Sequence, residues 1–283
     1  MAALAYGAAE IQRGTVSEVL PQLAQGGTAG GAYPKALVLL YDDGTLRASK
    51  PDGEGVPYLL KFDLSQENEN APCEHVYAIM AQAAGIKSVE TTLIAESKTT
   101  ARRHLLIKRF DIPDQKNPQR RLHFHSASGL LHKAPADLDY RDLFRVAIRL
   151  NVNPLELMEI ARRMVFNVLG SNHDDHGKNH AFLYDEDQKT WSLTPAFDLN
   201  YTTGILERGM LVSGEVWPSF KTMEALCIDA GMTKKEFKKI FEEVDAAITQ
   251  WPRFAKQAGV SSSMAQEIKE RHRRIRNEVI RDY

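Results

Sequence analysis

The most informative stretch of the sequence is Ser171-Asn-His-Asp-Asp-His-Gly-Lys-Asn-His180, which is dense in polar and ionisable side chains. It lies between the pattern of a long helix and the pattern of a strand pair. Asp174 and Asn179 are separated by four residues, and Asp198 follows Asn179 by 19 residues. Phosphoryl transfer from a nucleotide requires a carboxylate that receives the substrate hydroxyl proton, and oxygen ligands that hold Mg²⁺. These three side chains can supply both, so the stretch predicts phosphoryl-transfer chemistry.

The spacing of these residues is that of protein kinases. The kinase catalytic loop separates its Asp and Asn by four residues, and a metal-binding Asp follows the next hairpin. Lys61 on the third predicted strand and Glu74 in the following predicted helix supply the ion pair with which such enzymes place the phosphates. A single Asp-x₄-Asn match is weak, but all of these parts in this order make the prediction specific.

A glycine-rich segment, Gly26-Gly-Thr-Ala-Gly-Gly-Ala-Tyr-Pro-Lys35, leads directly into the first predicted strand. Glycines allow backbone N–H groups to approach phosphate oxygens closely. The segment is neither a Walker A sequence nor the Gly-x-Gly-x-x-Gly of ordinary protein kinases. It predicts either a loop that covers nucleotide phosphates or a flexible connection.

The first 110 or so residues have the pattern of short strands. Asp42-Asp43-Gly44 is a strong hairpin signal between two of them, because Gly accepts a positive φ. Apolar residues alternate along the third strand and put Lys61 on the opposite face. The expected elements are strands at 36–41, 45–49, 58–64, 88–95 and 104–110, with a helix at 72–84 after the third strand.

From about residue 140 the pattern becomes helical. Asn153-Pro154 is a good pair for the start of a helix, and Thr233-Lys-Lys-Glu236 is a capping box. The apolar stripe after the capping box continues to Trp251, which predicts a single helix. The expected elements are helices at 154–169, 233–251 and 262–279, with a strand pair at 181–184 and 191–194. The sequence therefore predicts an α+β protein, with a strand-rich N-lobe over 1–111 and a mainly helical C-lobe over 112–283.

Composition excludes several classes of protein. The chain has 283 residues, 43% of them hydrophobic and 26% charged, which is typical of globular proteins and not of disordered or fibrous ones. The net charge of -1 gives no indication of a nucleic-acid or membrane partner. The run Ala36–Tyr41 is too short to cross a bilayer, and the first ten residues lack the basic region of a secretory signal. Two cysteines, Cys73 and Cys227, make no disulfide framework, so we expect a cytoplasmic protein.

Four stretches resemble the HipA family of bacterial serine/threonine kinase toxins: Gly30–Val38, Leu106–Asp111, Asn172–Phe182 and Leu193–Leu199. The resemblance spans about residues 26–200, and the pair Asp-Asp-His-x-Lys-Asn-His and Thr-Pro-x-x-Asp-Leu is highly specific. It implies a protein-kinase-like two-lobe fold. It also implies transfer of the γ-phosphate of ATP, with Mg²⁺, to a hydroxyl of an aminoacyl-tRNA synthetase.

The resemblance also implies roles for individual residues. Asp174 would be the catalytic base, Asn179 and Asp198 would bind the metal, and Lys61 would contact the phosphates. Thr28 occupies the place of a hydroxyl residue that becomes autophosphorylated in several members. The other residues implied to border the nucleotide are Gly30, Gly31, Ala32, Tyr33, Pro34 and Lys35 in the loop, Glu74 beside Lys61, Lys108, Arg109 and Phe110 at the adenine, and His176 and Lys178.

The length of the region before the glycine-rich segment bears on which partner proteins the resemblance implies. About 25 residues precede that segment, whereas long members of the family carry an extra N-terminal subdomain. The sequence therefore resembles the short form, which belongs to three-component toxin–antitoxin systems. This implies a DNA-binding antitoxin partner and a separate small protein equivalent to the missing subdomain. Lys108 also replaces an acidic residue that some members carry.

Several alternatives stay open at this point. Asp174, Asn179 and Asp198 could cap turns, as Asp and Asn often do. His173 with Asp174 could belong to a metal-dependent His-Asp phosphohydrolase, although such enzymes are wholly helical. A small-molecule kinase of the same architecture and a binding module without catalysis are further possibilities.

Some charged side chains have a simpler interpretation. Lys61 and Glu74 could each be solvated, and Thr28 could be an ordinary loop hydroxyl. The basic run Arg271–Arg276 predicts a solvated helix face, with contact to nucleic acid as the alternative.

Overall fold

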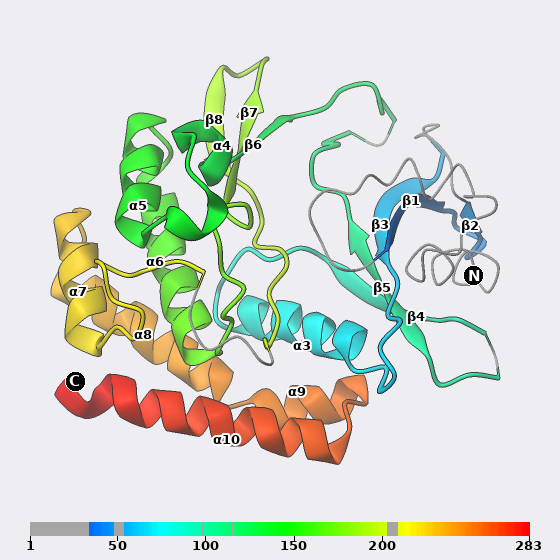
Figure 1. The fold of residues 1–283 in the computed structure, drawn as a ribbon. Helices are drawn as coiled ribbons and strands as arrows, with labels where there is room; N and C mark the ends of the chain where they lie inside the picture. The colour runs from blue at the N-terminus through cyan, green and yellow to red at the C-terminus, as the bar shows by residue number, and fades with distance from the viewer. Residues whose placement is uncertain (1–33, 48–53, 98, 115, 203–208) are drawn as a thin grey trace. The chain divides into compact units, whose positions relative to one another are not determined.

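The chain divides into two compact units in a computed structural model (Figure 1). The structure describes residues 34–47, 54–97, 99–114, 116–202 and 209–283. One unit comprises residues 1–75 and 89–121, and the other comprises 76–88 and 122–283. The functional boundary predicted after Asp111 stays a prediction.

The first unit contains an antiparallel sheet with the strand order β2-β1-β3-β5-β4. Helix α3 begins in this unit, between the third and fourth strands along the chain. This is the predicted order of elements. The bounds are β1 (Lys35–Leu40), β2 (Leu46–Arg47), β3 (Val56–Lys61), α3 (Asn70–Ala83), β4 (Thr91–Ala95) and β5 (Arg103–Lys108).

The predicted hairpin joins β1 to β2. The Gly44 N–H donates to the carbonyl oxygen of Tyr41 at 2.9 Å, and Gly44 has a φ of +79°, which a glycine adopts without strain. Asp43 accepts hydrogen bonds from the backbone N–H and the hydroxyl of Thr45. The local turn residues therefore determine the register of this strand pair. The predicted end of the second strand, at Ser49, lies outside the described residues.

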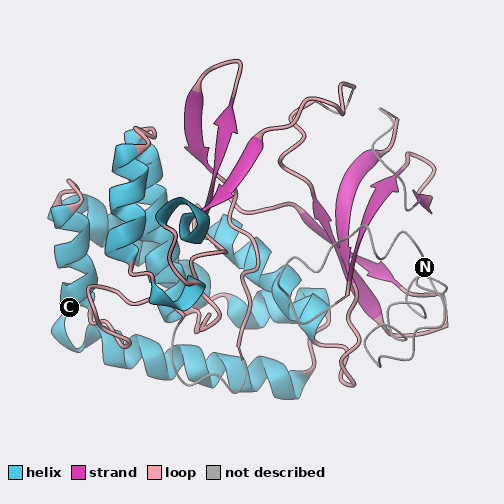
Figure 2. Cartoon of the chain, turned by 45° about the horizontal axis from the view of Figure 1, so that its top comes forward, coloured by secondary structure: helices cyan, strands magenta, loops and turns pink. Residues whose placement is uncertain are grey.

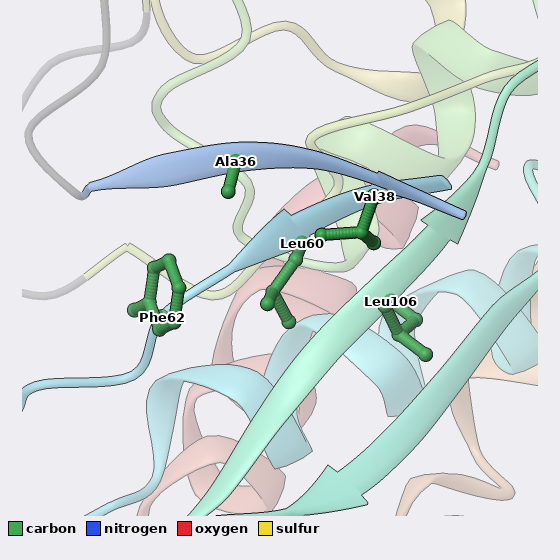
Figure 3. Close-up of a cluster of buried hydrophobic side chains, with 5 residues drawn as sticks. All are labelled: Ala36, Val38, Leu60, Phe62 and Leu106. Atoms are coloured by element: carbon green, nitrogen blue, oxygen red, sulfur yellow. The ribbon is translucent and has the colours of Figure 1, made fainter. Parts of the chain in front are cut away.

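One hydrophobic cluster of this unit lies on one face of the sheet, where residues of β1, β3 and β5 and the segment after β3 pack together (Figure 3). The cluster consists of Ala36, Val38, Leu60, Phe62 and Leu106. Side chains alternate along β3, so Lys61 belongs to the opposite face. The expected strand to Leu64 is too long: β3 ends at Lys61. The Phe62 N–H still donates to the carbonyl oxygen of Pro34, but the Asp63 N–H donates to the His104 side chain instead of a backbone carbonyl.

The second unit is mainly helical and carries a small antiparallel sheet of order β6-β7-β8 (Figure 2). Helices α6 and α8 pack against each other. The helices are α4 (Ala127–Leu131), α5 (Tyr140–Arg149), α6 (Pro154–Leu169), α7 (Phe220–Asp229), α8 (Lys234–Ile248), α9 (Trp251–Ala258) and α10 (Ser262–Val279). The strands are β6 (His123–Ser126), β7 (Ala181–Asp185) and β8 (Thr190–Leu193), and short 3₁₀ turns lie at Pro135–Asp137 and Ile280–Asp282.

Capping residues set the helix starts that the sequence predicts. The Asn153 side chain accepts from Leu155 N–H at 2.9 Å, and Thr233 forms a capping box with Glu236. One prediction is wrong, because the stripe ending at Trp251 is divided between two helices. Pro252 cannot lie inside a continuous helix, since it lacks an N–H and its ring clashes with the preceding turn.

Helix α10 carries the basic run. The expectation of a solvated face is wrong for part of it, because His272 and Ile275 are buried, whereas Arg273 and Arg274 are exposed. Over the described part of the chain, no helix combines the length and the apolar character needed to cross a membrane.

Candidate active site

The predicted catalytic loop, 171–180, connects α6 to β7 in the second unit. It has no regular secondary structure, and Ser171 at its start has a φ of +54°. Its two adjacent carboxylates lie in different surroundings: the Asp174 side chain is 62% exposed, whereas that of Asp175 is 2% exposed. The loop therefore presents one carboxylate to solvent and buries the next.

A buried hydrogen-bond network surrounds Asp175. His180 Nε2 lies 2.6 Å from Asp175 Oδ1, and the Tyr140 hydroxyl donates to Asp175 Oδ2 at 2.6 Å. Asn167 on α6 donates to the Tyr140 hydroxyl oxygen at 3.0 Å and accepts from the Asn172 amide at 3.1 Å. The network fixes the loop to α5 and α6.

No role for this network was predicted from the sequence. Its signal was present, because Asp175 and His180 belong to the same polar stretch as Asp174. Tyr140 lies 35 residues from its partner, which hides the connection from any local pattern.

The loop brings Asp174, His176 and Asn179 together. The Asp174 carbonyl oxygen accepts from the Asn179 amide at 3.0 Å, and Asn179 N–H donates to the His176 carbonyl oxygen at 2.9 Å. His176 Nε2 lies 3.7 Å from Asp174 Oδ1, and Asp174 N–H donates to Thr202 Oγ1 at 3.2 Å. The amide nitrogen of Asn179 is thus used within the loop, and its oxygen is the atom suited to a hard metal. Lys178 is exposed.

Asp198 follows β8 in a strained backbone conformation. Its φ of +55° is uncommon outside glycine, and such outliers persist where the surrounding structure enforces them. A cavity of about 10 Å³ is lined by Asn179 together with Phe197 and Leu199, which flank Asp198. The two predicted metal ligands therefore belong to segments that border the same small cavity.

Arg163 on α6 supports the segment before Asp198. Its guanidinium is buried, donates to the Thr194 carbonyl oxygen at 2.7 Å and pairs with Glu159 at 2.9 Å. Burial lowers the pKa of Arg163, and the Glu159 carboxylate opposes that shift. Ala196 N–H also donates to the Lys87 carbonyl oxygen at 2.7 Å. A buried arginine on a helix was not predicted from the sequence, and nothing in its local pattern marks it.

Gly177 is required for close packing. A Cβ built at this position would lie 2.5 Å from Ser128 Oγ and 2.7 Å from Leu138 Cδ2. Ser128 N–H donates to the Gly177 carbonyl oxygen at 3.1 Å, and Gly177 N–H donates to that of Pro135 at 3.0 Å. The glycine between His176 and Lys178 thus lets α4 and the following turn close against the loop.

The first unit contains the predicted lysine and glutamate. Lys61 Nζ lies 2.6 Å from Glu74 Oε1, and the two side chains are 14% and 15% exposed. The strand register places Lys61 opposite Lys35 on β1 and Leu105 on β5. The structure forms this ion pair, and its role toward phosphates stays a prediction.

Residues 108–110 end the β5 segment. The N–H groups of Lys108 and Arg109 donate to the carbonyl oxygens of Glu90 and Pro57, each at 3.0 Å. The side chains of Lys108 and Arg109 pair with Glu90 and Asp111. An adenine bound here would therefore take its hydrogen bonds from other backbone atoms of 108–110.

The predicted phosphate loop is described only at its end. Pro34 accepts from Phe62 N–H at 3.1 Å, and Lys35 begins β1. Thr28 and residues 30–33 lie outside the described residues.

The histidines of the polar stretch do not converge. His173 Nε2 lies 3.0 Å from Ser171 Oγ, and its ring packs edge-on against Trp217, whereas His180 contacts Asp175. Within the described ranges, no three His, Cys, Asp or Glu side chains are grouped as a metal site. The separate contacts of His173 and His180 do not favour the phosphohydrolase alternative.

The chain is similar to a named bacterial protein and to a protein of known structure. The Sinorhizobium fredii protein Y4mE, whose name describes it as a kinase, is 25% identical over 241 residues, which cover 82% of this chain and 50% of that protein. The chain thus spans about half the length of that relative. HipA of Shewanella oneidensis MR-1, solved as a toxin–antitoxin complex with HipB and operator DNA, superposes with a TM-score of 0.66 at 15% identity. That match covers 88% of this chain and 63% of HipA, and it shows the fold.

A weaker match is the Helicobacter pylori proinflammatory kinase CtkA, with a TM-score of 0.44 at 13% identity, over 79% of this chain and 94% of CtkA. The model of the HipA-like C-terminal domain matches residues 27–274. Since that match covers most of the sequence and HipA itself shares the fold, the chain belongs to the family of HipA-like C-terminal domains.

Proposed function

We propose that this protein is a HipA-like kinase that transfers the γ-phosphate of ATP to a serine or threonine hydroxyl of a protein. The observation that carries this proposal is the loop in which Asp174 is exposed while its neighbour Asp175 is anchored in a buried network. A general base has to reach its substrate and yet keep a fixed position, and this arrangement provides both.

Each residue has a defined task in the proposed reaction. Asp174 receives the proton of the attacking hydroxyl, and Lys61, oriented by Glu74, neutralises phosphate oxygens. His176 and Lys178 border the nucleotide, as residues 30–35 and 108–110 do. The side chains proposed as ligands fit Mg²⁺ in their chemistry, because Asn179 and Asp198 offer the amide and carboxylate oxygens that this ion prefers. When bound, the metal ion would neutralise the charge that develops on the transferred phosphoryl group.

The substrate and partners are proposed by similarity. HipA of Shewanella oneidensis is found with HipB and operator DNA, so we propose that this chain works with a DNA-binding antitoxin. We also propose that it works in the cytoplasm. A separate small protein equivalent to the N-terminal subdomain of long HipA proteins would be a second partner. An aminoacyl-tRNA synthetase is the proposed substrate.

Thr28 is the proposed site of autophosphorylation. A phosphate adds a charge of about -1.5 to -2 at neutral pH, and in a loop that covers ATP phosphates it would repel the nucleotide. Mass spectrometry after incubation with Mg-ATP, beside ATP titrations of modified and unmodified protein, tests this. Unchanged ATP affinity after modification of Thr28 would show that it is not a switch.

The decisive experiment for the function is incubation with labelled ATP, Mg²⁺ and a cell lysate. A labelled protein band is expected, and its identification names the substrate. Label found only in small molecules would instead support the small-molecule kinase of the same architecture. No transfer to any component would contradict both.

The metal role of Asp198 has its own test. Asp198→Ala should reduce ATP affinity in the presence of Mg²⁺ by about tenfold or more and change it little without the metal, because one of few oxygen ligands is lost. Calorimetric titration measures both affinities. Equal affinity of wild type and variant with Mg²⁺ would contradict the assignment.

A further inference from the structure

Asp63 is a buried carboxylate two residues beyond Lys61, at the point where the chain leaves β3. Its Oδ2 accepts from Ala71 N–H at 2.9 Å, in the first turn of α3. Its Oδ1 accepts from the N–H and the hydroxyl of Ser65, at 3.0 and 2.5 Å. The first N–H groups of a helix lack partners within the helix, so Asp63 satisfies one of them across a gap of eight residues.

The backbone of Asp63 is fixed to the sheet. Its N–H donates to His104 Nδ1 on β5 at 3.1 Å, and its carbonyl oxygen accepts from the Arg102 guanidinium at 2.8 Å. The first turn of α3 contains no acidic residue of its own. The Asp63 carboxylate is therefore well placed to balance the positive end of the helix dipole while its backbone stays with the strands.

Two contacts then join the same strand end to the same helix. Lys61 contacts Glu74, and Asp63 contacts Ala71. Ala71 and Glu74 are three residues apart, which places them on one face of α3. The contact made by Asp63 thus holds the helical turn that carries Glu74.

We propose that Asp63 is a positioning residue that sets the contact between Lys61 and Glu74. The proposal rests on the proposed function in one respect, namely that Lys61 contacts phosphates. Without the Asp63 carboxylate, the start of α3 loses a partner and Glu74 is displaced from Lys61. The ammonium of Lys61 then becomes more accessible and less fixed.

Acetylation of Lys61 by an N-hydroxysuccinimide ester, followed by mass spectrometry of the full chain, tests this without ATP. Asp63→Ala and Glu74→Gln should each raise the rate of acetylation by about threefold or more. If Asp63 acts through Glu74, the double variant should react no faster than the faster single variant. Multiplied effects in the double variant, or an unchanged rate in Asp63→Ala, would overturn the proposal.

Val38→Ala is the matched control for stability. It removes methyl groups from the core cluster and touches neither contact, so Lys61 should react at the wild-type rate. An equal acceleration in this variant would mean that Asp63 acts only through general stability, which also overturns the proposal. Because the labelling uses no ATP, a chain that transfers no phosphate but responds to Asp63→Ala would refute the proposed function alone.

Discussion

Asp174 in the second unit lies beside a buried hydrogen-bond network. In the first unit, Lys61 at the end of β3 instead forms a direct ion pair with Glu74 on α3. In the second unit, Asp175, His180, Tyr140 and Asn167 share the support of the loop. In the first unit, the single carboxylate of Asp63 makes the corresponding contact. The exposed loop is thus held by a buried network that links several segments, whereas the ion pair between β3 and α3 is flanked by the contact of Asp63 with the start of α3.

The largest effect is expected from Asp174→Asn. Phosphoryl transfer should fall by about 10²- to 10⁴-fold because the proposed general base loses its carboxylate, while the free energy of unfolding stays near that of wild type. Labelled-ATP transfer and chemical denaturation measure the two quantities. Glu186→Gln, an exposed carboxylate in the turn between β7 and β8, is the matched control and should transfer normally. Near-normal transfer by Asp174→Asn would contradict the role proposed for Asp174.

Asp175→Ala should act mainly on stability, whereas Asp174→Asn acts mainly on phosphoryl transfer. It leaves the buried His180 and the Tyr140 hydroxyl without their partner, so the free energy of unfolding should fall by about 3 kcal/mol. Urea denaturation followed by circular dichroism measures this. A stable variant would mean that the buried network does not support the loop.

Acid should destabilise the second unit through His272. Burial lowers the pKa of His272 to about 4 from the ordinary value of 6.5. The unfolded chain therefore binds a proton at a higher pH than the folded chain does. The stabilisation is complete above pH 6.5 and is lost as the pH falls from 6.5 toward 4, by up to about 3 kcal/mol.

Denaturation curves of wild type and His272→Gln over this pH range separate the contribution, since the variant should show a flatter dependence. Burial also lowers the pKa of His104 in the first unit, so protonation of His104 should likewise destabilise the fold as the pH falls. Equal slopes in wild type and His272→Gln would contradict the assignment to His272.

The smallest effect is expected from Thr233→Ala, which changes neither the loop of Asp174 nor the pair of Lys61 and Glu74. Loss of the cap on α8 should cost about 1 kcal/mol of unfolding free energy and leave phosphoryl transfer unchanged. Thermal denaturation measures the loss of stability, and the labelled-ATP assay measures phosphoryl transfer. A large loss of transfer here would show that modest destabilisation alone impairs activity, and it would weaken conclusions drawn from Asp175→Ala.

Elements with strong local signals could be predicted from the sequence. The start of α6 follows its cap at Asn153, and Asp42–Gly44 gives the first hairpin. Strand β6 was missed because its hydrogen-bond partner, β7, lies far along the chain and none of its own residues is fully buried. Helix α7 was also missed, although Ser219 caps it and its buried residues recur at helical spacing.

The candidate site was predictable where spacing carries the chemistry. Asp174, Asn179, Asp198 and the Lys61 pair stand at distances along the chain that local patterns reveal. The residues that support them could not be predicted in this way. Arg163 contacts a carbonyl 31 residues away, and Asp63 contacts a histidine 41 residues away. Burial and long-range hydrogen bonds determine these residues, and no periodic pattern encodes them.

The last helix has a consequence for how the protein is made. His272 on α10 lies 3.2 Å from the carbonyl oxygen of Gly170, which Tyr77 also contacts, and Arg271 donates to Ser171 Oγ at 3.3 Å. These contacts span 102 and 100 residues. Because a ribosome synthesises the loop long before α10, the nascent chain carries Asp174 without these two contacts at the head of its loop. We expect the finished loop only after α10 has left the ribosome.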